Sequence, residues 1–182
     1  MNNHDKLYSI LTKYNVKLYL SGHMHIQHAN KDESVTEILT SALSITPHQY
    51  GLINYNSKGE CIYKYSTKIT NVEEYAKSIN STDEKLLNFY EYSKTFYQES
   101  SYKKSYEQIM FHNSSLYKEA EALGRLMSLL NCPYFEGSAY DILSNIKETE
   151  DYKLIEKLDM KKYIDSIIDG SNYDYRYIDI KR

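Results

Sequence analysis

One stretch, Val16–His28, limits most strongly what this chain can fold into. Val16–Leu20 is an apolar run of strand length, and Gly22 breaks it immediately before His23 and His25. Side chains two positions apart in an extended segment point to the same face. Neutral imidazole is a common protein ligand for zinc, manganese and iron. We therefore expect this strand to deliver two imidazoles into one space, which is half of a metal site.

The surrounding sequence predicts a mixed region of helix and strand over residues 1–75. Apolar residues at helical spacing predict a helix over 5–14, and residues 35–45 are expected to form a strand or a strand pair. Tyr50–Tyr55 and Cys61–Ile69 read as two strands of a hairpin, joined by a turn that contains Gly59. Ile26–Glu33 is expected to be a loop.

After residue 75 the pattern becomes helical. We expect helices over about 81–101, 105–130, 138–147 and 151–168, with Cys132 and Pro133 ending the second of them. The tail from Tyr173 alternates, so it predicts either a strand at a sheet edge, in its own chain or in a neighbour's, or a frayed end. The predicted fold class is α+β, with one domain over residues 1–75 and an α-helical extension over residues 76–182.

Charge and composition exclude some classes of function. The net charge is −3, and the first 75 residues carry seven basic and seven acidic side chains, so no basic stripe is available to follow a nucleic-acid backbone. No apolar run approaches the ~18 residues that a membrane span needs, and the N-terminus lacks a signal-peptide pattern. Cys61 and Cys132 are isolated, which is typical of free thiols in a reducing compartment. The expected location is the cytoplasm.

With its preceding helix and strand and the hairpin that follows, Gly22-His23-Met24-His25 resembles the last metal-binding motif of the calcineurin-like metallophosphoesterases. The resemblance covers residues 1–75. It implies the C-terminal part of a layered α/β sandwich that hydrolyses phosphomonoesters or phosphodiesters with two divalent ions such as Mn, Fe or Zn. It further implies that His23 binds one ion and His25 the other.

The sequence departs from this family in one respect. Members carry Asp-x-His, Gly-Asp and Gly-Asn-His-Asp/Glu motifs upstream, and only twenty-one residues precede Gly22. We therefore expect a truncated or split phosphoesterase that is inactive alone, binds one ion weakly or none, and needs an N-terminal half. The alternative is a non-catalytic binding or oligomerisation module in which the histidines are relics, so the sequence does not decide whether the chain is an enzyme. Both readings predict self-association or a partner, because an incomplete sheet exposes an edge.

Two further histidines are candidates for substrate binding. His28 and His48 lie near the motif, and either could contact a phosphate or donate a proton. The alternative for each is a solvated histidine in a polar loop. Ser41 and Ser44 lack a Gly-x-Ser-x-Gly elbow, and we predict no catalytic residue beyond the metal ligands.

Overall fold

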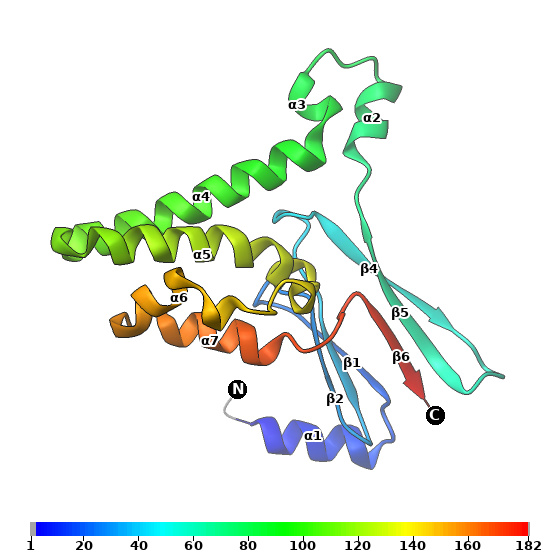
Figure 1. Cartoon of the computed structure of the whole chain (residues 1–182). Helices are drawn as coiled ribbons and strands as arrows, with labels where there is room; N and C mark the ends of the chain where they lie inside the picture. Colours follow the sequence, from blue (N-terminus) through cyan, green and yellow to red (C-terminus); the bar gives the residue numbers. More distant parts are fainter. Residues whose placement is uncertain (1–2, 182) are drawn as a thin grey trace.

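The N-terminal layer is a small mixed sheet with one helix beside it (Figure 1). The computed structural model describes residues 3–181. Helix α1 (His4–Lys13) leads into β1 (Leu18–Ser21), and β3 (Thr36–Leu39) lies between β1 and β2 (His28–Lys31). Strand β1 is parallel to β3, whereas β2 is antiparallel to it. The first helix and the strand that follows it are therefore confirmed, with slightly different ends.

Strand β2 was not expected, and a side chain in the turn after it explains why it forms. The Asp32 carboxylate accepts hydrogen bonds from the backbone N–H groups of Val35, at 2.9 Å, and Ser34, at 2.6 Å. These two bonds hold the pKa of the Asp32 carboxyl group below its usual value, and the bond from Val35 contributes most. They also reverse the chain, so that His28–Lys31 pairs with β3. The prediction of a loop over Ile26–Glu33 is wrong for this part of the segment.

The second sheet contains the predicted hairpin and the end of the chain. Strand β4 (Gln49–Tyr55) pairs with β5 (Cys61–Ile69), and β5 pairs with β6 (Tyr177–Lys181), with both pairs antiparallel. The hairpin turn is closed by Asn56, whose side-chain oxygen accepts from the backbone N–H groups of Lys58 and Gly59. Of the alternatives for the tail, the structure shows a strand at a sheet edge of its own chain.

The helical region lies between β5 and β6. It comprises α2 (Val72–Ser78), α3 (Glu84–Leu87), α4 (Phe89–His112), α5 (Tyr117–Glu136), α6 (Glu150–Leu154) and α7 (Lys161–Gly170), with short 3-10 turns between some of them. Helices α4 and α5 form an antiparallel hairpin, and α6 and α7 lie along α5 on the side away from α4 (Figure 1). The α+β class is confirmed.

The helix expected over 138–147 is wrong, because only the 3-10 turns Ala139–Asp141 and Ile146–Glu148 form there. Other helices have different bounds from those expected. Helix α4 continues through residues 101–105 and stops at Asn113, whose extended backbone and side-chain bond to the N–H of Ser115 begin the next turn. Helix α5 continues past Pro133 and ends at Gly137, which has a φ of 86°. The predicted helix over 151–168 is interrupted at Leu158, between α6 and α7.

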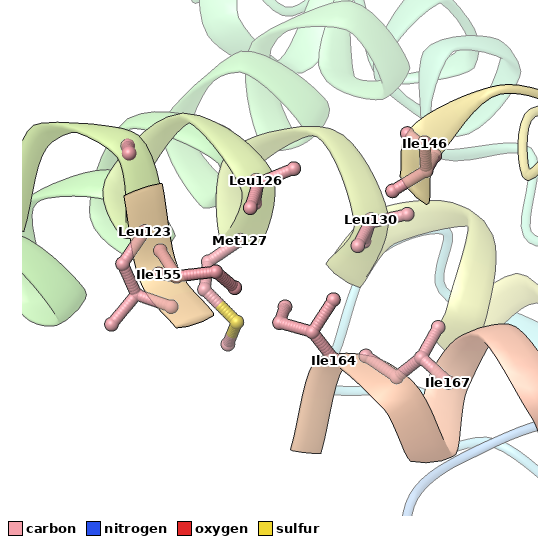
Figure 2. Close-up of a cluster of buried hydrophobic side chains, with 9 residues drawn as sticks. Leu123, Leu126, Met127, Leu130, Ile146, Ile155, Ile164 and Ile167 are labelled. Carbon is pink, nitrogen blue, oxygen red and sulfur yellow. The ribbon is translucent and has the colours of Figure 1, made fainter. Parts of the chain in front are cut away.

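The main hydrophobic core lies between α5 and the elements that follow it. Leu123, Leu130, Ile155, Ile164 and Ile167 are almost completely buried, and Figure 2 shows these side chains converging from α5, the turn after α6, and α7. A second, smaller cluster joins the two sheets through Ile38 of β3, Tyr65 of β5 and Ile180 of β6. The helical core is therefore the larger source of hydrophobic stabilisation.

A buried glutamine joins the sheets to the helices. Gln27, which is 1% exposed, accepts a hydrogen bond from the Tyr65 hydroxyl at 2.8 Å and donates from Nε2 to the Tyr175 carbonyl oxygen at 3.0 Å. Its backbone N–H donates to the Phe135 carbonyl oxygen at 3.1 Å, near the end of α5. Burial also raises the pKa of Tyr65. The two predicted domains are therefore held together by these buried hydrogen bonds as well as by the continuous chain.

The junction provides a direct test of its contribution to stability. We expect Tyr65→Phe to lower the free energy of unfolding by about 1–3 kcal/mol, because it leaves the buried Oε1 of Gln27 without a donor. The matched control is Tyr55→Phe on β4, where the ring is exposed. Urea unfolding followed by circular dichroism measures both variants. Equal stabilities would show that the junction does not contribute.

The helices of residues 3–181 are each too short or too polar to cross a membrane.

Candidate functional site

The segment after β1 turns sharply, and it carries the two histidines predicted to bind metal. Strand β1 ends at Ser21, and both His23 and His25 have left-handed backbone conformations, with φ of 79° and 59°. Both residues are exposed, as is Met24 between them. We expected an extended segment to point both imidazoles to the same face. This expectation is wrong, because the backbone is in a left-handed conformation at both positions. For residues other than glycine such φ values cost roughly 1–2 kcal/mol each, and they are often found at functional sites.

Polar groups gather at the end of the parallel pair β1 and β3. The backbone N–H of Thr40 donates to the Ser21 carbonyl oxygen at 3.2 Å, which keeps the two strands together where they end. The hydroxyls of Ser21 and Ser41 are buried and have no hydrogen-bond partner within the described part of the chain. This end of the first sheet, with His23 and His25 beside Ser21 in the sequence, is the candidate functional site.

His28 lies on a different strand and lines a different pocket. Its Nε2 is 3.0 Å from the Gly170 carbonyl oxygen, and its ring centroid is 4.2 Å from that of Tyr175. It borders a pocket of about 640 Å³ between β2 and the segment from Asp169 to Asp179, where Lys31 donates to the Asp179 carbonyl oxygen. The hydrogen bond and the ring contact together tie β2 to the segment after α7.

His48 belongs to the loop between β3 and β4. Its Nδ1 lies 2.8 Å from the Leu43 carbonyl oxygen, and its ring centroid is 4.9 Å from that of Phe89. The residue has a φ of 57° and follows the cis bond between Thr46 and Pro47. These contacts position the loop against the start of α4. A role in substrate binding for His28 or His48 stays a prediction.

A complete metal site would need more ligands than this pair. Residues 3–181 contain no group of three or more His, Cys, Asp or Glu side chains that could hold a metal ion. Zinc sites ordinarily use three or four protein ligands. His23 and His25 therefore do not fit a metal site by themselves, and no reaction step can be assigned to an ion held by this chain alone.

Cysteine chemistry is disfavoured at the buried thiol of α5. Cys132 is 5% exposed, and desolvation is the main cause that raises its pKa to about 11. A thiol with this pKa is almost entirely protonated near neutral pH, and the thiolate is the nucleophilic form. Cys132 is therefore a packing residue.

Residues of the helical region that sequence reasoning missed line another cavity, between α4, α5 and α7. Asn131, a buried residue, is part of its lining, four positions after Met127 and four before Phe135. The signal in the sequence is an amide at helical spacing between two apolar residues of α5.

Comparison with protein families assigns the helical region. Residues 71–174 match the family described as the C-terminal domain of cyclic nucleotide phosphodiesterase. The match covers more than half of the sequence, and the chain belongs to this family. The family relates the chain to phosphoesterases. No protein with a curated description matches the chain.

This result corrects the family read from the sequence. The resemblance to the calcineurin-like metallophosphoesterases is wrong, because the family that matches is a different one and lies over α2 to α7. The resemblance rested on four residues, Gly22 to His25, and on predicted elements around them. A motif this short is consistent with many contexts, and here the backbone around it differs from the extended form on which the argument depended.

Proposed function

We propose that this chain is the non-catalytic C-terminal part of a cyclic nucleotide phosphodiesterase and works with a catalytic part that covers its N-terminal layer. The observation that carries the proposal is the uncovered apolar surface of α1 and β1. This surface occurs in a chain whose helical region matches a family named for a C-terminal domain. A C-terminal domain implies a further part of the enzyme, and the uncovered layer offers a place for that part to bind.

Helix α1 has an apolar stripe but no buried residue. Leu7, Tyr8, Ile10, Leu11 and Tyr14 form this stripe, and Ile10 is 45% exposed. An amphipathic helix in a folded protein ordinarily buries its apolar face, since most helix stability in proteins comes from packing. The stripe of α1 therefore fits a helix that is covered by another chain or segment.

Strand β1 has the same character. It pairs with β3 on one side, and within residues 3–181 no strand pairs with its other edge. Leu20 on this strand is 49% exposed. Free edges that carry apolar side chains are sites for the addition of a further strand. The catalytic part would extend the first sheet from β1 and cover α1.

This arrangement gives His23 and His25 a specific role. They lie directly after β1, so a catalytic part that pairs with β1 would bring its own side chains close to them. The two imidazoles would then supply part of a divalent metal site, with the remaining ligands from the catalytic part. The substrate of the assembled enzyme would be a cyclic nucleotide, whose phosphodiester bond is hydrolysed.

The purified chain should not hydrolyse cyclic AMP when assayed alone with added Mn²⁺. The reason is that His23 and His25 lack further ligands within residues 3–181. Product formation can be followed by chromatography, with the same preparation of His25→Ala as the matched control. Turnover by the chain that His25→Ala abolishes would contradict the proposal that it is non-catalytic.

The covering part can be sought in the coding sequence upstream of codon 1 and co-expressed with this chain. We expect a stoichiometric complex that Ile10→Asp and Leu20→Asp together disrupt, because both place a charge on the uncovered layer. Ile53→Asp on β4, where the side chain is 41% exposed, is the control. An upstream region without a phosphodiesterase part would contradict the proposal. A dimer of this chain alone, broken by the same pair, would also contradict it and identify an oligomerisation module.

A further inference from the structure

Strand β4 has a free edge that the proposed function does not use. The second sheet runs in the order β4-β5-β6, and within residues 3–181 no strand pairs with the other side of β4. The turn end of the β4–β5 hairpin lies away from the helices (Figure 1). On this part of β4 the side chains of Ile53 and Tyr55 are 41% and 65% exposed. The second half of the strand is therefore open at its edge.

The hydrogen bonds to β5 determine which backbone groups face this edge. At one end of the pairing the Thr70 N–H donates to the His48 carbonyl oxygen, and at the other end the Asn56 N–H donates to the Ile62 carbonyl oxygen, both at 2.9 Å. Bonded and non-bonded pairs alternate in an antiparallel ladder, so the even-numbered residues of β4 bond to β5. The odd-numbered residues direct their N–H and carbonyl groups to the free edge, namely Gly51, Ile53 and Tyr55.

The sequence of β4 does nothing to prevent pairing at this edge. Proteins commonly protect free edges with charged residues, proline or bulges. Gln49–Tyr55 contains no charged residue and no proline, and its pairing with β5 has an unbroken register. Two other edge strands do carry charges, since β2 contains Lys31 and β6 contains Asp179 and Lys181. The edge of β4 is therefore suited to the addition of a further strand.

The side chains of this edge are complementary to those of a second copy of the same edge. Ile53 and Tyr55 are two positions apart in a strand, so they lie on the same face of the sheet. If two β4 strands run antiparallel about a two-fold axis at Asn54, Ile53 of each copy lies opposite Tyr55 of the other. Pairs of a β-branched and an aromatic side chain stabilise antiparallel strands. Both exposed apolar side chains of each copy would thus be covered.

Charge also permits this pairing. The paired segment is uncharged, so no like charges lie opposite each other across the axis. The lysine in register with Asn54 is Lys64, which lies one strand back on β5. The two Lys64 residues of a dimer would be about three strand spacings apart, which is about 14 Å. This separation exceeds the Debye length of about 8 Å at physiological ionic strength, so their repulsion is screened.

We propose that two copies of this chain pair antiparallel along β4, with Asn54 of both copies on the two-fold axis, so that their second sheets form one continuous sheet. The backbone groups of Ile53 in each copy bond to those of Tyr55 in the other. One short strand a side is much smaller than the roughly 20–30 residues a side of a standard interface, so the dissociation constant should lie in roughly the micromolar range. This surface is separate from α1 and β1, and the inference does not rest on the proposed function.

Sedimentation velocity of the full chain at protein concentrations from about 1 to about 500 μM tests the dimer. We expect the average mass to rise from that of the 21.5 kDa monomer towards twice this value. Ile53→Asp should weaken association by at least about tenfold, because it places a charge on the edge. Ile10→Asp, which changes a similarly exposed isoleucine on α1, is the matched control and should not alter association. A monomer at every concentration, or a dimer that Ile53→Asp leaves intact, would overturn the proposal.

A cysteine on the two-fold axis tests the register. The two Asn54 residues would form a non-bonded pair with Cα atoms about 4.5 Å apart, which lies within the range of about 4.4–6.8 Å for disulfides. In a Cys61→Ser background, which leaves only the buried thiol of Cys132, mild oxidation should link Asn54→Cys into dimers on non-reducing gels. Lys64→Cys is the matched control and should stay unlinked because of its distance from the axis. No linkage of Asn54→Cys, or equal linkage of both variants, would show that the chains do not pair in this way.

Discussion

Replacing Leu130 with alanine is expected to lower the free energy of unfolding by about 2–5 kcal/mol, among the largest effects of any single substitution in this chain. Leu130 is 0% exposed and lies among Leu126, Ile146 and Ile164 in the helical core (Figure 2). Removing its branched end leaves a cavity that the surrounding helices fill only in part. Urea unfolding monitored by circular dichroism gives the difference directly.

The neighbouring residue offers a matched control. Leu129 precedes Leu130 on α5 and is 46% exposed. The same substitution there should cost less than about 1 kcal/mol, because much less apolar surface leaves water when the protein folds. Similar losses for the two variants would contradict the placement of the core on one face of α5.

Replacing Gly137 with alanine is expected to lower the free energy of unfolding by about 2–4 kcal/mol for two separate reasons. Gly137 ends α5 with a φ of 86°, a conformation that disfavours a side chain. A Cβ at this position would also lie 2.7 Å from Cγ and 2.9 Å from the carbonyl oxygen of Gln27. The substitution therefore strains the helix end and displaces the residue that joins the sheets to the helices.

Gly170 is the control for this prediction. It is the last residue of α7, and a Cβ added there would meet no atom within 4 Å. Gly170→Ala should leave the free energy of unfolding unchanged or raise it by about 0.4–1 kcal/mol, because alanine restricts the unfolded chain. Thermal unfolding of both variants side by side separates a general effect of alanine from the specific geometry at Gly137. A loss at Gly170 equal to that at Gly137 would refute the geometric explanation.

Local patterns in the sequence predicted much of the fold. The apolar spacing before Asn15 predicted α1, and the alternation around Gly59 predicted the hairpin of β4 and β5. The ends of the long helices were less predictable, because they depend on competing local and tertiary effects. The side-chain oxygen of Asn113 accepts a hydrogen bond from the backbone N–H of Ser115, and α4 ends there. Pro133, in contrast, does not end α5. Proline in a helix costs about 3 kcal/mol, and we infer that the packing of α5 against α4 and α7 offsets this loss.

The candidate site was less accessible to sequence reasoning. The motif at His23 and His25 led to a family assignment that the comparison overturned, while the matched region, 71–174, carried no motif that we recognised. A helical domain is specified by a distributed pattern of packing residues, and such a pattern is compatible with many families. The unpartnered side-chain oxygen of Asn131 could not be inferred either, because hydrogen-bond satisfaction depends on which side chains meet in space.

The last strand, β6, pairs with β5, which precedes the helical region. This pairing matters for any attempt to isolate the helices. The matched family ends at residue 174, and β6 occupies Tyr177–Lys181. A fragment trimmed to the family boundaries would lose both β5 and β6, and with them the strand pairing that holds the two ends of the helical region together. A graft of these helices onto another scaffold needs two attachment points, one at β5 and one at β6, as for an insertion into a host protein.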